Sequence, residues 1–190
     1  MTESLHTRAT NEGPRRGAQN PQALLTAAAE LFAEKGYDAP LYEVARRAGV
    51  GQGSLYRHFR GRESIVLALY GQNFQVLEDL AEASAERTDS FFVLLEALVQ
   101  QVVDSLGYAD ALTRLPHEDV APYLDRVDEL FAGPIARAQA GGHLRQDFTA
   151  ADLRLVAQML YGVLRATPSE EREEQIRRAL ALLGLARRTD

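Results

Sequence analysis

The stretch PLYEVARRAGVGQGSLYRHF, residues 40–59, decides the fold of this chain. Apolar residues repeat at helical spacing after Pro40, and Gly49 ends this first helix after about two turns. A turn of three residues separates it from a second short helix, which we predict over residues 52–59. Two short helices joined by a glycine turn of this length form a helix-turn-helix unit.

Helical patterns continue on both sides of this unit. Upstream, Asn20-Pro21 is a preferred start, because Asn caps helices well and Pro suits the first helical position. Downstream, we predict helices over about 62–86, from Asp89 to Gly107, over about 109–115 and 118–140, from Thr149 to about 166, and from Thr167 onward. Asp89, the Thr149/Asp152 pair and Thr167 are the expected caps, and Gly133-Pro134 is expected to kink or break its helix.

These patterns predict an all-α protein of about nine helices without strands. We expect three parts: a disordered basic arm over residues 1–19, a three-helix DNA-binding domain over 20–61, and a larger helical bundle for ligand binding and dimerisation over 62–190.

The composition is that of an ordinary globular chain and excludes several classes of protein. Apolar residues make up 46% and charged residues 25% of the 190 residues, and cysteine is absent. The four histidines lack metal-ligand spacing, and we find no phosphate loop, nucleophile–base pair or suggestive carboxylate pair, so we expect no metal, no cofactor and no enzymatic activity. No apolar run approaches the roughly 20 residues of a membrane span, and no signal peptide is found, so we expect a cytoplasmic protein.

Charge is distributed unevenly along the chain. The net charge is −6, which by itself argues against a nucleic-acid partner. Residues 1–62, however, carry nine Arg and Lys against six Asp and Glu, whereas residues 63–190 carry twelve against twenty-one. Salt limits the reach of a field to about 8–10 Å, so the local balance decides. A basic end on an acidic body fits a protein that touches DNA with one end.

The second short helix has two chemically different faces. Leu55 and Phe59 are four residues apart and should point into the small domain. The other positions carry hydrogen-bond donors or allow close backbone approach, as base edges and phosphates in a major groove require. The DNA-binding candidates, including flanking arginines, are Arg46, Arg47, Gln52, Gly53, Ser54, Tyr56, Arg57, His58 and Arg62.

The stretch from Ala23 to Leu69 resembles the DNA-binding domain of the TetR family of bacterial regulators. The resemblance rests on ELFAEKGY (residues 30–37), VARRAGV (44–50) and SLYRHF (54–59). The chain departs from the family pattern before the second helix and at the start of the recognition helix, which leaves the operator sequence open.

The resemblance implies a ligand-responsive regulator, usually a repressor, that binds double-stranded DNA as a homodimer. A two-fold dimer requires an inverted-repeat operator. An enzyme and a ligand-independent architectural DNA-binding protein are the alternatives; loss of turnover on mutation would favour the first, and many genomic sites without ligand response the second.

Two further sites are expected in the C-terminal bundle. A mostly apolar effector cavity is expected between the helices that begin near Arg62, Asp89, Glu118 and Thr149, because the Gly133-Pro134 break should leave space there. The candidates are Phe74, Phe92, Leu95, Val99, Tyr108, His117, Tyr123 and Met159. The last two helices resemble the pair that dimerises in this family, and they carry more apolar surface than one packing partner needs. The dimer-interface candidates are Met159, Leu160, Val163, Leu164, Leu180 and Leu183.

Overall fold

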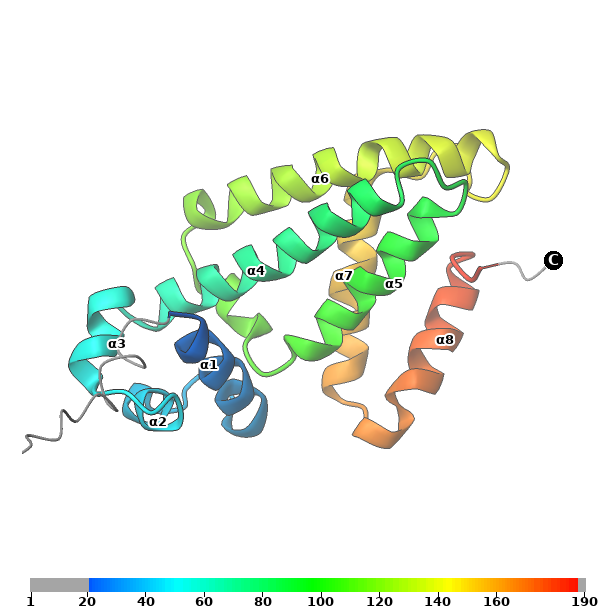
Figure 1. Cartoon of the computed structure of the whole chain (residues 1–190). Coiled ribbons are helices and arrows are strands. Elements are labelled where there is room, and N and C mark those ends of the chain that lie inside the picture. The colour runs from blue at the N-terminus through cyan, green and yellow to red at the C-terminus, as the bar shows by residue number, and fades with distance from the viewer. Residues whose placement is uncertain (1–20, 188–190) are drawn as a thin grey trace, which may run out of the picture.

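The computed structural model describes residues 21–187, and within this range the chain is entirely helical (Figure 1). Eight α-helices and two 3₁₀ helices replace the nine expected, and no strand occurs in the range. The α-helices are α1 (Pro21–Lys35), α2 (Leu41–Arg47), α3 (Gln52–His58), α4 (Arg62–Ala83), α5 (Ser90–Asp104), α6 (His117–Ala140), α7 (Ala150–Arg165) and α8 (Arg172–Leu182). The 3₁₀ helices are η2 (Ala109–Thr113) and η3 (Ser169–Glu171). The predicted cap Asn20 and the arm over residues 1–19 lie outside the described residues.

The three N-terminal helices form the expected helix-turn-helix unit at one end of the molecule (Figure 1). Gly49 has a φ of 70°, the left-handed conformation that glycine adopts without strain. The amide of Val50 donates to the carbonyl of Ala45 at 2.9 Å, and the amide of Gly49 donates to Arg46 at 3.1 Å. These bonds end α2 and turn the chain into α3, which confirms the predicted glycine turn.

The remaining helices form a bundle that extends away from this unit. In Figure 1, α4 runs from the three-helix end into the bundle, where α5 and α6 pack against it and α7 packs against α5 and α6. The bundle core contains fully buried Phe74, Phe91, Phe131 and Leu153. Helix α8 differs from the others, because it packs mainly on α7 and contains no buried residue.

A second apolar core crosses the expected boundary between residues 61 and 62. It joins the helix-turn-helix to the first half of α4, to η2 and to the start of α6. Its members beyond residue 61 are Ile65, Val66, Leu69, Tyr70, Tyr108, Ala111, Leu115 and Val120. The DNA-binding helices therefore share one continuous core with η2 and the start of α6.

The expected break at Gly133-Pro134 is wrong. Helix α6 continues through Pro134, whose ring is buried on the same face as Phe131 and Ile135. Proline removes one backbone hydrogen bond, but packing of this apolar face holds the adjoining turns in helical geometry.

Several predicted helix ends also differ. The capping box of Thr149 and Asp152 is confirmed, with the Thr149 amide donating to the Asp152 carboxylate at 2.8 Å. Asp89 makes no side-chain cap, because its carboxylate is bound by Arg87 and Arg187. The Thr167 hydroxyl donates back to the carbonyl of Val163, so the last α-helix begins only after η3. The predicted helix over 109–115 is the 3₁₀ helix η2, and α4 ends at Ala83 rather than near residue 86.

Candidate nucleic-acid interface and ligand cavity

Helix α3 presents one apolar and one hydrogen-bonding face. Leu55 and the following Phe59 are buried in the core of the helix-turn-helix. The opposite side is exposed and carries Gln52, Gly53, Tyr56, Arg57 and His58. Over half of the Tyr56 surface (55%) is open to solvent, so its hydroxyl is available to a partner outside the chain.

Two acidic residues of this end, Glu34 and Glu43, are occupied by ion pairs away from α3. Arg47 forms a bidentate pair with Glu34, with nitrogen–oxygen distances of 2.7 and 2.6 Å, and Lys35 contacts Glu43 at 2.5 Å. The hydrogen bond from Arg47 lowers the pKa of Glu34, and that from Lys35 lowers the pKa of Glu43. Both carboxylates are therefore ionised and neutralised locally.

Two arginines at the recognition helix remain free of such pairs. Arg57 lies in the last turn of α3 and Arg60 follows it, and both are exposed. Neither forms an ion pair with any residue between 21 and 187. Unpaired guanidinium groups next to exposed Tyr56 can bind phosphate oxygens or guanine edges.

The DNA-binding candidates from the sequence fall into two groups. Arg46, with a 78% exposed side chain, and the exposed α3 residues lie on the surface as expected. Three others lie elsewhere. Arg47 is held by Glu34, Ser54 is buried, and the Arg62 guanidinium donates to the carbonyl of Tyr37.

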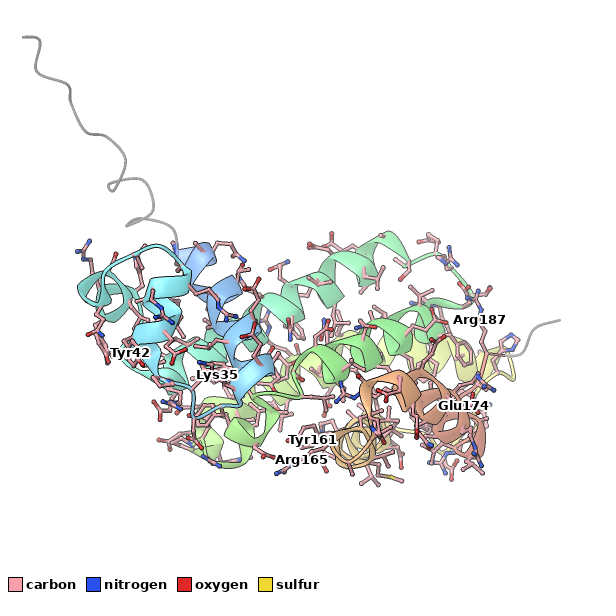
Figure 2. All side chains as sticks on the ribbon, turned by 90° about the horizontal axis from the view of Figure 1, so that it is seen from below. Lys35, Tyr42, Tyr161, Arg165, Glu174 and Arg187 are labelled. Carbon is pink, nitrogen blue, oxygen red and sulfur yellow. The ribbon has the colours of Figure 1, made fainter. Side chains whose placement is uncertain are left out.

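Sequence reasoning placed Arg60 on the exposed side of the recognition helix with Tyr56 and Arg57, but it did not consider Tyr42. Tyr42 lies in the first turn of α2, is 50% exposed, and donates a long hydrogen bond to Glu43 at 3.4 Å. Figure 2 shows it at the three-helix end of the molecule. The signal available in the sequence was that Tyr42 does not belong to the helical repeat of apolar residues that includes Leu41 and Val44.

A cavity of about 380 Å³, partly open to solvent, lies between α4, α5, η2, α6 and α7. This volume falls in the range of about 300–1,000 Å³ typical of small-molecule sites. The residues around it are mainly apolar or uncharged: Tyr70, Asn73, Leu98, Gln101, Val102, Ser105, Ala109, Leu112, Tyr123, Leu124, Val127, Leu153, Arg154, Ala157, Gln158 and Tyr161. Burial raises the pKa of Tyr123 to about 12 and also raises that of Tyr70, so both phenols are neutral near pH 7.

Of the eight ligand-binding candidates, Tyr123 lines this cavity. Four others, Phe74, Leu95, Val99 and Tyr108, are buried core residues, whereas His117 and Met159 are exposed. Phe92 borders a separate open depression near Arg87 and Arg187, at the far end of the bundle. The physical reason is that large side chains fill space. The cavity exists where small residues such as Ser105, Ala109 and Ala157 stand.

Helices α7 and α8 leave an apolar surface uncovered. Leu155, Met159 and Val163 follow one another at four-residue spacing on α7, and each is between 44% and 53% exposed. On α8 and just beyond it, Leu182 is 87% and Leu183 37% exposed. The interface candidates are thus divided: Met159, Val163 and Leu183 lie on this surface, Leu180 is half-buried, and Leu160 and Leu164 are buried within the chain.

Comparison with known proteins identifies the family. Residues 24–69 match the profile of "Bacterial regulatory proteins, tetR family". The chain is 30% identical over 111 residues to the HTH-type transcriptional repressor KstR2 of Mycolicibacterium smegmatis, and this match spans 54% of each protein.

Two solved structures cover most of the chain. The TetR transcriptional regulator SCO0520 of Streptomyces coelicolor is 26% identical, covers 87% of this chain and 96% of its own, and superposes with a TM-score of 0.65. The TetR transcription regulatory protein of Mycobacterium vanbaalenii is 30% identical over 79% and 95% of the two chains, with a TM-score of 0.53. None of the helices between residues 21 and 187 is both long and apolar enough to cross a bilayer. The chain belongs to the TetR family of bacterial transcriptional regulators, whose members bind DNA through the helix-turn-helix described above.

Proposed function

We propose that this regulator is a cytoplasmic repressor that binds an inverted-repeat operator as a homodimer and is released by a small, mostly apolar effector. The observation that carries the proposal is the exposed, donor-rich face of α3, on which Arg57 and Arg60 have no carboxylate partner among residues 21–187. Gln52 and Arg57 are assigned to base edges, and Tyr56 and His58 to phosphates. KstR2, described as a repressor, supports repression over activation.

The dimer assignment is supported by the uncovered surface of α7 and α8. Helix α8 contains no buried residue and packs only the partly buried Ile176, Ala179 and Leu180 against the bundle core, so packing from a second copy would stabilise it further. A second copy that packs its own α7 and α8 against Met159, Val163 and Leu182 would bury this surface in a two-fold arrangement. Two α3 helices related by that axis read two half-sites.

Coupling between cavity and DNA is assigned to η2 and the residue that follows it. Ala109 and Leu112 of η2 line the cavity. Asp110 accepts a hydrogen bond from Tyr161 at 2.6 Å and pairs with Arg165 at 2.9 Å, and both partners lie on α7 next to each other (Figure 2). One short segment thus touches the cavity and the helix assigned to the dimer.

The same segment holds the DNA-binding helices. The guanidinium of Arg114 lies 5.4 Å from the ring centroid of Tyr37 and 3.7 Å from the carboxylate of Asp38. Arg62, at the start of α4, holds the same two residues, with its guanidinium 5.1 Å from the ring and 3.4 Å from the carboxylate. We call this arrangement the Tyr37 clamp. A ligand that displaces η2 moves one side of the clamp, which supports transmission to α1–α3.

Selection from a random pool of DNA duplexes tests the proposed function. Repeated cycles of binding and amplification with the purified protein should enrich a two-fold inverted repeat. A search of the DNA flanking the gene should find the same repeat. Enrichment of a single unrepeated half-site, or of no sequence at all, would contradict a dimeric repressor. Sequence-independent binding without any ligand response would favour the architectural alternative.

Replacing Arg114 with alanine should uncouple ligand from operator. The change removes one side of the Tyr37 clamp but no residue of α3, so we expect operator affinity without ligand to stay within a few-fold. In the unchanged protein a releasing ligand should weaken operator binding by about 5–150-fold, the usual range of allosteric coupling. In the variant, the ratio of operator affinity without ligand to that with ligand should fall toward one. Fluorescence anisotropy measures this ratio, and the ligand is a compound that raises the melting temperature of the protein.

The matched control for this experiment is Arg145→Ala. Arg145 also lies near an aromatic ring, 5.5 Å from Phe148, and pairs with Asp152, but at the opposite end of the bundle. The Arg145→Ala change should leave the effect of ligand on operator affinity unchanged. An Arg114→Ala protein with full ligand response would remove η2 from the coupling path.

A further inference from the structure

We propose that the effector acts on the DNA-binding helices through Gly107, whose backbone lies directly against the backbone of α1. The inference rests on the proposed function, because it names the contact through which the bundle cavity regulates DNA binding. A ligand in the cavity displaces the turn of residues 105–109, and this turn displaces the end of α1 that leads into α2.

Gly107 lies between α5 and η2, where the chain passes the C-terminal end of α1. A methyl group on its Cα would lie 2.1 Å from the carbonyl oxygen of Phe32 and 2.7 Å from the Cα of Ala33, far inside contact distance. The φ of Gly107 is not positive, so its backbone conformation does not require glycine. Space alone requires it, because the two backbones leave no room for a side chain between them.

The same turn forms one wall of the cavity. Ser105 and Ala109, two positions before and after Gly107, both line it. The amides of Tyr108 and Ala109 donate to the carbonyl of Ser105 at 2.9 Å, so residues 105–109 form one tight turn. This turn continues into the 3₁₀ helix η2, whose hydrogen-bond geometry is poorer than that of the α-helices in the other walls. A ligand larger than the free space therefore displaces this wall first.

The contact on α1 involves the group that ends this helix. The Phe32 carbonyl accepts a hydrogen bond at 2.8 Å from the amide of Gly36, whose φ of 81° turns the chain toward α2. Buried Tyr108 adds a side-chain contact from the same turn, with its ring centroid 6.2 Å from that of Phe32. Displacing the turn toward α1 would press on Phe32 and shift α1 against α2. The two α3 helices of a dimer would then no longer match the spacing of the half-sites.

Gly107→Ala builds this displacement into the protein without a ligand. The added methyl group forces the turn and α1 apart, so operator affinity should fall by about 5–150-fold, the usual range of allosteric coupling. The matched control is Gly71→Ala, because Gly71 is an exposed glycine inside α4 with open space where the methyl group would lie. The control should bind operator with the affinity of the unchanged protein. Anisotropy titration without ligand measures both variants.

A second readout distinguishes this role from damage to the fold. Coupling between two sites is reciprocal, so a variant held in the released conformation should bind ligands of the cavity more tightly. N-phenyl-1-naphthylamine is a neutral apolar probe that fluoresces in apolar surroundings. Titration of the full chain without DNA should give a several-fold lower dissociation constant for Gly107→Ala than for Gly71→Ala. Ala157→Phe, which fills the cavity from α7, should abolish probe binding.

The outcomes separate this inference from the proposed function. Equal operator affinity of Gly107→Ala and its control, or weaker operator binding without tighter probe binding, would overturn it, as would failure of the probe to bind the unchanged protein. A melting curve verifies that Gly107→Ala folds. If it does not, Tyr108→Trp takes its place, because the larger ring presses on Phe32 from the same turn and should give the same two changes. An unchanged protein that binds no inverted repeat would contradict the proposed function instead, and the probe titration alone would then decide on Gly107.

Discussion

Introducing arginine at both Met159 and Val163 is expected to give a monomer that has lost at least about 100-fold in operator affinity. Both side chains lie on the uncovered surface of α7, one turn apart, and make few contacts within the chain. In a two-fold interface each substitution occurs twice, so four cations would be buried near one another without partners. Each monomer then binds one half-site alone, without the gain in affinity that a dimer obtains by holding both half-sites at once. Sedimentation equilibrium and anisotropy titration on the same samples measure both effects.

The control for this prediction is Val76→Arg. Val76 is also a large apolar residue with 59% exposure, but it lies on α4, away from α7 and α8. The Val76→Arg protein should remain dimeric and bind operator with the affinity of the unchanged protein. A parent protein that is already a soluble monomer at micromolar concentration, or a double variant that stays dimeric, would remove α7 and α8 from the interface.

Arginine at Leu160 would not report on the dimer in the same way. Leu160 is 1% exposed and packs in the bundle core with Leu153 and Val156. A charge there is buried within each subunit, which costs several kcal/mol of folding stability whether or not a dimer forms. The interface can therefore be tested cleanly only at the exposed positions of α7.

Sequence patterns predicted the elements that local chemistry determines. The glycine turn at Gly49 and the Thr149/Asp152 capping box depend on residues within a few positions of one another, and both are present. The apolar spacing of Leu55 and Phe59 likewise fixes which side of α3 is buried. Such features need no knowledge of the rest of the fold.

The sequence predicted less well where distant packing decides. Proline was expected to break α6 at Pro134, but burial of its face outweighs the lost hydrogen bond. On α7, Leu160 and Val163 are equally apolar, and only the placement of α5 and α6 decides that the first is buried and the second exposed. Ion pairs such as Arg47 with Glu34 join residues thirteen positions apart and remove a cation that looked free in sequence.

The cavity illustrates the same limit. Aromatic residues such as Phe74 and Tyr108 were expected to line it, but they fill the core instead. A cavity is a place where side chains fail to fill space, so its position depends on small residues at facing positions of four helices.

Removing Arg57 and the Tyr56 hydroxyl should have separable effects on DNA binding. Arg57→Ala removes a guanidinium assigned to a base edge, so we expect a loss of about 1–3 kcal/mol on the selected operator and little change on unrelated duplexes. Tyr56→Phe removes only a hydroxyl that we assign to a phosphate, so binding should weaken a few-fold on every sequence. Arg60→Ala removes a charge that we assign to a phosphate. Combining this change with Tyr56→Phe should also flatten the dependence of operator affinity on salt concentration.

The control for both variants is Arg145→Ala, which removes a guanidinium at the opposite end of the bundle. It should leave affinity, sequence preference and salt dependence unchanged. Because Arg57 and Tyr56 point away from the buried Leu55 and Phe59, neither substitution should lower the melting temperature, so lost binding cannot be attributed to unfolding. Anisotropy titrations over a range of salt concentrations, on operator and scrambled duplexes, measure both readouts. An Arg57→Ala protein that keeps full discrimination between the two duplexes would move sequence reading from α3 to another element, and exposed Tyr42 of α2 would be the first residue to test.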